Sequence, residues 1–197
     1  MRSDRVKKTN YGYVLAYILA PAALGALGVW MGRAFLWGDS QWAGLCDMGP
    51  LLLAILWWAF GGRIIFYGGK KKLLRQLDGM GIDHRQIFYS DDCVVSMDMG
   101  QAKLALLFFW NPFTPYLVPA GRVIRAWTDD GARGTGILRG TGRVSFWFEV
   151  DGVKIRVNTF LSNQRWRLDD DRVLEGISKA DMWVHVLEQA RRQEAGV

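Results

Sequence analysis

Few residues in this chain are of types that could do chemistry, and their spacing matches no catalytic or metal-binding motif. Two glycine–threonine–glycine triplets, at 134–136 and 140–142, have the composition of phosphate-binding loops. A phosphate loop also requires a following Gly-Lys-Ser/Thr sequence and a helix, and neither follows here. We therefore expect both triplets to be flexible turns.

The acidic runs and the two histidines give no metal signature either. Asp91-Asp92 and Asp169-Asp170-Asp171 lack the ligand spacing of a calcium-binding hand, so solvated turns are the favoured interpretation. His84 stands in a polar connector and His185 in a segment of helical periodicity, where a lone histidine is usually structural. No serine lies in a nucleophile elbow, and no cysteine–histidine arrangement is readable. The sequence thus predicts no enzyme, no cofactor and no metal site.

Length and charge suit one compact domain joined to a membrane anchor. The chain has 197 residues and a net charge of +6. Its cations cluster beside apolar segments and do not form a long basic face interleaved with aromatic residues, which argues against nucleic acid as a partner. Cys46 and Cys93 are too few for a disulfide framework, and we expect them on opposite sides of the membrane.

Two long apolar stretches predict a transmembrane helical hairpin. The first runs from about Tyr11 to Phe35 and the second from about Gly49 to Tyr67. Each meets the length of about 20 residues that crosses the hydrocarbon core. Arg33 and Arg63 are their only charges, and each is near an end, from which a guanidinium group can reach the headgroups. A buried arginine used in transport is the alternative, but neither stretch has a carboxylate to pair with it.

Basic residues on both flanks give the expected orientation. The connecting loop, 37–48, has two aspartates and no lysine or arginine, whereas four cations precede the first stretch and four follow the second. The positive-inside rule therefore predicts a multi-pass protein of the bacterial inner membrane, with N- and C-termini cytoplasmic. A cleaved signal peptide is the competing interpretation of the first stretch, although its apolar run is longer than usual. The cations after the second stretch form a basic collar that is also a candidate contact for anionic lipid: Lys70, Lys71, Lys72 and Arg75.

Small residues along the first stretch are candidates for helix–helix contact. They are Gly25, Gly28 and Gly32, and the last two have the spacing that lets helix backbones approach closely. Packing within the hairpin and docking onto other membrane helices both remain open. We accordingly expect membrane lipids, and either other membrane-protein subunits or a second copy of this chain, as partners.

Residues 1–77 are thus expected to form the anchor and its collar, and residues 78–197 a β-rich domain. Segments 93–97, 103–110 and 116–127 are apolar enough for strands, with a break at Asn111-Pro112-Phe113-Thr114-Pro115. The clearest signal is a hairpin. Apolar residues alternate through 144–150 and 153–157, on either side of an Asp-Gly turn.

An amphipathic helix is expected to close the chain. Ser178 would cap it, with Asp181 three residues further on. An apolar stripe at helical spacing then predicts a face that packs on the sheet: Met182, Trp183, Val186, Leu187 and Ala190.

Several antiparallel strands followed by one such helix resemble a bacterial pleckstrin-homology-like (PH-like) domain over about residues 88–193. The resemblance rests on the hairpin from Phe146 to Phe160, the helix bearing Trp183, and the runs CVVSMDMGQAKLALLFF and YLVPAGRVIRAWTDD. It implies an α+β fold in which a bent antiparallel sheet or barrel is closed by the C-terminal helix. Other small β-barrels and rolls stay open. No basic loop matches the one with which eukaryotic relatives bind phosphoinositides, so that activity is not implied.

Together these features favour a non-enzymatic inner-membrane scaffold or accessory subunit of a larger bacterial membrane assembly. A secretion or conjugation apparatus is one setting, and the PH-like domain would supply the protein contacts. A membrane immunity protein that neutralises a toxin is one alternative. A lipid-sensing module that acts through the basic collar is another.

Overall fold

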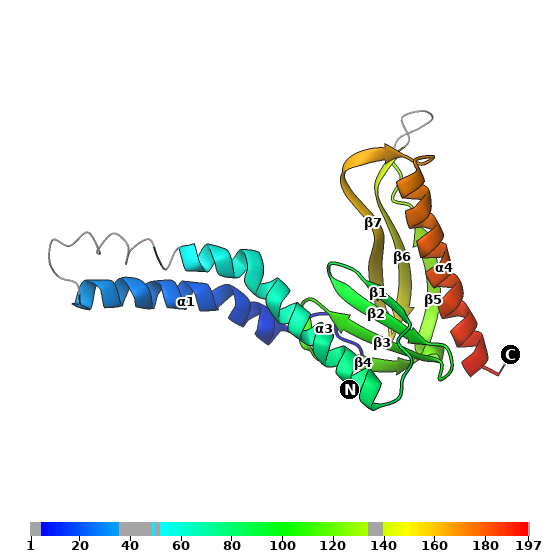
Figure 1. The fold of residues 1–197 in the computed structure, drawn as a ribbon, viewed down its shortest axis with the longest axis horizontal. Coiled ribbons are helices and arrows are strands. Elements are labelled where there is room, and N and C mark those ends of the chain that lie inside the picture. Colours follow the sequence, from blue (N-terminus) through cyan, green and yellow to red (C-terminus); the bar gives the residue numbers. More distant parts are fainter. Residues whose placement is uncertain (1–4, 36–48, 50–51, 134–139, 197) are drawn as a thin grey trace.

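In the computed structural model, a pair of helices projects from a β domain that carries the C-terminal helix (Figure 1). The structure describes residues 5–35, 49, 52–133 and 140–196. The elements in chain order are α1 (Tyr11–Phe35), the π-helix η1 (Trp57–Gly61), α3 (Gly62–Gly79), β1 (Gln86–Tyr89), β2 (Cys93–Asp98), β3 (Lys103–Phe108), β4 (Asn111–Pro119), the 3-10 turn η2 (Ala120–Arg122), β5 (Val123–Asp129), β6 (Gly140–Val150), β7 (Val153–Arg167) and α4 (Asp171–Glu194). The expected α+β arrangement of a helix pair, antiparallel strands and a closing helix is confirmed.

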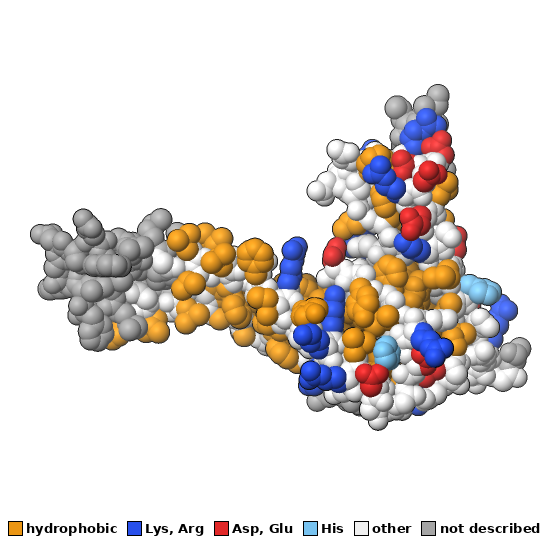
Figure 2. All heavy atoms as spheres, in the orientation of Figure 1, with side chains coloured by type: hydrophobic (Ala, Val, Ile, Leu, Met, Phe, Trp, Pro, Cys, Tyr) orange, Lys and Arg blue, Asp and Glu red, His pale blue; other side chains and the backbone are white. Residues whose placement is uncertain are grey.

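Both helices of the pair are long and apolar enough to cross a membrane, over Tyr11–Trp30 and Leu52–Gly79. Their large apolar side chains face outwards, with Leu53 68% and Trp30 63% exposed. Figure 2 shows hydrophobic side chains along the pair, and lysine and arginine side chains where the pair meets the β domain. An apolar surface of this extent is costly in water.

The π-helix η1 lies where the second helix approaches α1. The Tyr17 hydroxyl donates to the main-chain oxygen of Trp58 at 2.8 Å, and the Trp57 indole donates to that of Tyr17 at 3.2 Å. Gly61 is required here because an added Cβ would lie 2.9 Å from the Trp57 ring. Since wide helical turns present main-chain carbonyls to neighbours, these hydrogen bonds hold the two helices together at this level.

The β domain consists of two antiparallel sheets, with strand orders β1-β2-β3-β4 and β5-β6-β7. The predicted hairpin is confirmed: β6 pairs with β7, and Asp151 and Gly152 take φ angles of 55° and 77° in the turn. The alternating side chains of β6 lie in a core shared with the four-stranded sheet, and all four are fully buried: Val144, Phe146, Phe148 and Val150.

The predicted break at Asn111–Pro115 is wrong, because those residues begin β4. β4 is an edge strand of its sheet, and proline is tolerated there because an edge strand has main-chain groups outside the ladder. The single strand expected over 116–127 is instead divided by η2 into β4 and β5, which belong to different sheets.

The glycine–threonine–glycine triplet at 140–142 was expected to be a flexible turn. That prediction is wrong, because the triplet begins β6. A Cβ at Gly140 would lie 2.7 Å from the main-chain oxygen of Trp166, so glycine allows β6 and β7 to approach closely. The triplet at 134–136 lies outside the described residues.

Helix α4 begins at Asp171, seven residues before Ser178. The prediction that Ser178 caps this helix is therefore wrong. Asp170 caps the helix instead, since its carboxylate accepts from the main-chain N–H of Arg172 at 3.1 Å. The predicted apolar stripe packs on the sheet in part: Trp183 stacks on Phe146 with ring centres 5.7 Å apart. Leu187 and Ala190 are also buried, Val186 is half-buried, and Met182 is 54% exposed.

Helix α3 packs directly on the four-stranded sheet. Leu73 and Leu77 are fully buried in a second apolar cluster with residues of β2 and β3. The approach is closest at Gly69, where an added Cβ would lie 2.5 Å from the main-chain oxygen of Pro112. The β domain therefore packs on the helix itself, besides being joined to it through residues 80–85.

Candidate functional site

The segment before α1, residues 5–10, is part of the β domain. Val6 is 2% exposed within the main core, and its N–H donates to the Asp151 carboxylate at 3.2 Å. The Asn111 side chain donates to the main-chain oxygen of Lys7 at 3.0 Å. The β domain is therefore contacted both by the segment that precedes the first helix and by the last part of the second helix, α3.

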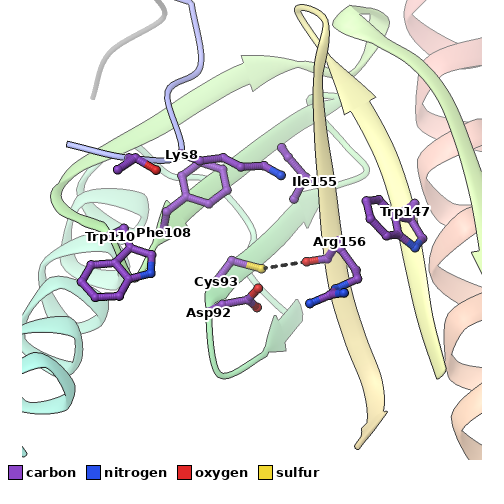
Figure 3. A pocket seen from close by; sticks show the side chains of 9 residues that line it. Lys8, Asp92, Cys93, Phe108, Trp110, Trp147, Ile155 and Arg156 are labelled. Atoms are coloured by element: carbon purple, nitrogen blue, oxygen red, sulfur yellow. Dashed lines mark hydrogen bonds between the residues drawn. The ribbon is translucent and has the colours of Figure 1, made fainter. Parts of the chain in front are cut away.

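A cavity of about 240 Å³, the junction pocket, lies between this segment and the strands (Figure 3). Charged side chains enter it from three parts of the chain: Lys8 from the N-terminal segment, Asp92 from the β1–β2 turn and Arg156 from β7. The Lys8 ammonium group donates to the main-chain oxygen of Lys154. The Arg156 guanidinium carbon lies 5.7 Å from the centre of the Trp147 ring. The remaining lining residues are Thr9, Cys93, Phe108, Trp110 and Ile155.

The Arg156 Nε atom is buried, and it has no hydrogen-bond partner among the described residues. A buried unsatisfied donor on a charged group costs more than about 1–3 kcal/mol. An acceptor supplied by a ligand would remove that cost, so the pocket is suited to an anionic or polar group.

Cys93 is the residue of the pocket most often associated with covalent chemistry, and its surroundings disfavour such a role. Burial raises the pKa of the Cys93 thiol well above its ordinary value, and the neighbouring Asp92 carboxylate raises it further. The thiol therefore stays protonated at neutral pH, whereas the thiolate is the nucleophile. Burial also lowers the pKa of Lys8. The pocket offers cations and hydrogen-bond donors rather than a nucleophile.

A wider groove of about 830 Å³, the junction groove, adjoins the pocket on the side of the helix pair. The two are neighbours because Asp92 and Trp110 line both. Helix α3 contributes two cations, Arg63 and Lys70, and the turns of the sheet contribute Asp91 and aromatic rings. The full lining is Arg63, Ile64, Phe66, Tyr67, Lys70, Ser90, Asp91, Asp92, Phe109 and Trp110.

The predicted lipid-contact residues are divided between this groove and the outer face of α3. Lys70 lies in the groove, its ammonium nitrogen 4.8 Å from the Phe66 ring centre and 5.2 Å from that of Tyr89. The other three are exposed: Lys71, Lys72 and Arg75.

The candidate helix-contact glycines all lie on α1. Gly25 and Gly28 are half-buried, and Gly32 belongs to the same helix. The contact remains a prediction.

Sequence reasoning missed Lys8 and Arg156. Lys8 was used only as one of the four cations before the first apolar stretch, and Arg156 only as a polar residue that alternates with the apolar residues of the hairpin. The sequence did contain one signal. Lys154, Arg156 and Asn158 alternate with apolar residues, which predicts that they share one polar face of the strand, and another segment of the chain can pack on such a face.

Two residues of the second acidic run have structural partners: the Asp169 carboxylate accepts from the Arg167 guanidinium at 2.9 Å, and Asp170 caps α4. A further aspartate and one of the candidate histidines also have partners. Asp98, buried in β2, accepts from the N–H groups of Asp83 and Gln101, both at 3.0 Å. His84 lies 3.5 Å from the Asp78 carboxylate. Within the part of the chain that the structure describes, no group of three or more histidine, cysteine or acidic residues is arranged to hold a metal ion.

A third cavity, of about 280 Å³, separates β1 from α4, and we call it the β1–α4 groove. β1 is an edge strand, and in the described residues it pairs only with β2. The floor is apolar, through Phe88 and Trp183, and two cations stand at its border, Arg85 and Lys179. The other lining residues are Gln86, Ile87, Met182 and Val186.

Comparison with known proteins gives no match to a family model, a curated protein or a solved structure.

Proposed function

We propose that this chain is a non-enzymatic adaptor of the bacterial inner membrane, which uses a PH-like domain to bind another protein of the same membrane assembly. In this proposal both helices of the pair span the bilayer, and both termini lie on the cytoplasmic side.

The membrane placement is supported by the agreement of composition and charge. Two helices of sufficient length and apolarity lie side by side, and their exposed surfaces carry leucine, isoleucine and tryptophan. Lys7 and Lys8 lie in the segment that contacts the β domain, and the basic collar lies on α3, which packs on the four-stranded sheet. Cations gather on the cytoplasmic side of membrane proteins, so this distribution favours a cytoplasmic β domain. Lys71, Lys72 and Arg75 are then suitably placed to contact anionic headgroups.

The PH-like assignment is supported by element order. Four strands form one antiparallel sheet, three form the next, and a single helix closes the core between them. Such a domain usually functions by binding rather than by catalysis, although a fold does not dictate an activity.

The observation that carries the proposed binding function is the β1–α4 groove. An edge strand can accept an extended segment of another protein as an additional strand, while a neighbouring groove receives its side chains. Here the edge of β1 adjoins an apolar floor containing Phe88 and Trp183, with Arg85 and Lys179 at its border. The expected partner segment is extended, with apolar side chains and flanking carboxylates.

The attachment of the domain at two places also favours an adaptor. Helix α3 packs on the sheet through Leu73 and Leu77, and Val6 inserts into the core from the other side of the helix pair. A partner bound in the β1–α4 groove would therefore be held at a fixed height above the bilayer, as subunit assembly requires.

Site-specific photocrosslinking in native membranes tests this proposal. A photoreactive amino acid at Gln86 or Met182 should give the same partner adduct, while one at the exposed Gln189 of α4, outside the groove lining, should give none. Met182→Asp should abolish the adduct formed from Gln86, and the partner peptide identified by mass spectrometry should be apolar with acidic flanks. Equal crosslinking from Gln189, or no adduct from either groove position, would contradict the proposed binding function.

The membrane placement has its own test. The protein should resist extraction from membranes by alkaline carbonate, and an exposed residue such as Gln189, changed to cysteine in a Cys46→Ser background, should react with a membrane-impermeant maleimide only after spheroplasts are lysed. Extraction by carbonate, or labelling of intact spheroplasts, would contradict the placement.

A further inference from the structure

We propose that the junction pocket and junction groove together bind one anionic glycerophospholipid, with its phosphate group in the pocket and its glycerol and upper acyl chains in the groove. This inference rests on the proposed membrane placement but is independent of the protein partner.

The position of the groove suits a ligand that enters from the bilayer. Its rim includes Arg63 and Ile64, where the apolar surface of the second helix ends, and Ile64 is 69% exposed. Phe66, Tyr67, Phe109 and Trp110 line its length. Aromatic side chains are enriched at this level of membrane proteins because their rings suit the border between hydrocarbon and headgroups.

The charges favour one class of headgroup. Four cations line the two neighbouring cavities, Lys8 and Arg156 in the pocket with Arg63 and Lys70 in the groove, against the carboxylates of Asp91 and Asp92. The difference of four and two leaves an excess of two positive charges. No ion pair of the described residues involves any of these four cations. A zwitterionic headgroup would leave this excess in place, whereas the net negative charge of an anionic phospholipid reduces it.

Within the pocket, Arg156 is the best placed phosphate ligand. Its Nε donor is buried without a partner in the described residues, and the planar guanidinium is suited to bidentate recognition of phosphate oxygens. Figure 3 shows the Lys8 side chain extending across Phe108 towards Ile155, and Arg156 entering the same pocket from β7. A phosphate between them would receive donors from two segments that are distant in sequence.

The size of the cavity agrees with this ligand. The groove measures about 830 Å³ and the adjoining pocket about 240 Å³. Sites for small molecules and cofactors typically measure about 300–1,000 Å³, so there is room for a headgroup, the glycerol unit and the first part of the acyl chains.

Native mass spectrometry of the delipidated, full-length protein in detergent provides the test. The probes are dioleoylphosphatidylglycerol, dioleoylphosphatidylcholine and soluble glycerol 3-phosphate, titrated against the wild-type protein and against Arg156→Gln. The control variant is Arg165→Gln, an exposed arginine of the same strand outside both cavities.

We expect one phosphatidylglycerol to bind the wild-type protein more tightly than phosphatidylcholine does. Arg156→Gln should weaken that binding about tenfold or more, because a charge-assisted hydrogen bond is lost, and Arg165→Gln should not weaken it. Lys70→Gln provides a second variant should Arg156→Gln prove unstable, as judged by circular dichroism. Glycerol 3-phosphate should bind more weakly than the lipid, since it lacks acyl chains for the groove.

Equal binding of the two phospholipids would overturn the inference, as would equal weakening by Arg156→Gln and Arg165→Gln. Binding of glycerol 3-phosphate as tightly as phosphatidylglycerol would also overturn it, because the site would then serve a soluble phosphate compound. A protein that resists carbonate extraction but fails these tests leaves the proposed membrane placement intact. If carbonate extracts the protein from membranes, both the proposed membrane placement and the lipid site are refuted.

Discussion

Replacement of Gly69 by alanine measures directly how closely the β domain packs against helix α3. The added Cβ would lie 2.5 Å from the main-chain oxygen of Pro112 and 3.3 Å from the Leu107 side chain. The first contact is with the backbone, which cannot simply rotate away, so the helix or the strand must shift. Gly68 is the matched control, because it precedes Gly69 in the same helix and a Cβ there meets nothing within 4 Å.

The expected magnitudes follow from two opposing effects. Replacing a helix-interior glycine by alanine stabilises the helix by about 1 kcal/mol at either position. Overpacking of a close contact costs about 1–3 kcal/mol, and only Gly69→Ala incurs it. Gly68→Ala should therefore be more stable than the wild type, and Gly69→Ala less stable than Gly68→Ala by about 1–3 kcal/mol. For a chain of this length that difference corresponds to about 2–12 °C in Tm.

Thermal unfolding of both variants in the same detergent, followed by tryptophan fluorescence, provides the assay. Limited proteolysis reports separately on the junction, and the segment between Gly79 and β1 should be cleaved faster in Gly69→Ala than in Gly68→Ala. If both variants gain the same stability and resist proteolysis equally, α3 does not pack on β4 as described and the reasoning fails.

Three further outcomes are expected. Leu77→Ala should lower the free energy of unfolding by about 2–5 kcal/mol, because Leu77 is fully buried, and chemical denaturation should show a smaller loss for the half-buried Leu74→Ala. Asp151→Ala should destabilise more than Asp151→Asn in the same denaturation assay, by about 1 kcal/mol or more, since asparagine tolerates the positive φ of 55° better than alanine and keeps an oxygen that can accept from the Val6 N–H; equal losses would refute a role for both. In a Cys46→Ser background, Cys93 should react with iodoacetamide at least about tenfold more slowly than free cysteine at pH 8. A folded protein that is alkylated at Cys93 as fast as the denatured protein would contradict this expectation. Because the pKa of Cys93 is raised in the folded state, its contribution to stability is complete below the ordinary thiol pKa. That contribution is lost as the pH rises from the ordinary thiol pKa through the raised one.

Local patterns predicted the parts of the fold that depend on neighbouring residues. Alternation from Val144 to Val150 and the Asp151-Gly152 turn indicated the β6–β7 hairpin, because side-chain direction along a strand changes with every residue. The stripe containing Trp183 indicated the buried face of α4 for the corresponding helical reason. In the hairpin and in α4, burial in the core determines which positions on one face carry apolar side chains, so the pattern is visible in the sequence.

The failures occurred where a distant contact decides the structure. Pro112 lies in a strand because that strand is at the edge of its sheet, and strand order cannot be read from the proline itself. Helix α4 extends beyond the predicted cap at Ser178 because Val173 and Gly176 are buried against the sheet, a contact that the cap residues themselves do not reveal. Most of the candidate site was missed for the same reason. Val6 and Asp151, whose contact places Lys8 beside Arg156, are 145 positions apart.

The insertion of Val6 into the β-domain core has a consequence for how the protein is made. Residues 5–10 leave the ribosome long before β6 and β7, yet their binding site is completed only when those two strands have been synthesised. In the proposed placement, the hairpin must meanwhile enter the bilayer with both of its flanks on one side. A chain whose first helix inserted in the opposite direction would carry Val6 across the membrane, and the core would fold with a vacant position that destabilises it. If the proposed placement holds, completion of the β domain would favour correctly inserted molecules, and membrane proteases would remove those in which the two flanks had been separated.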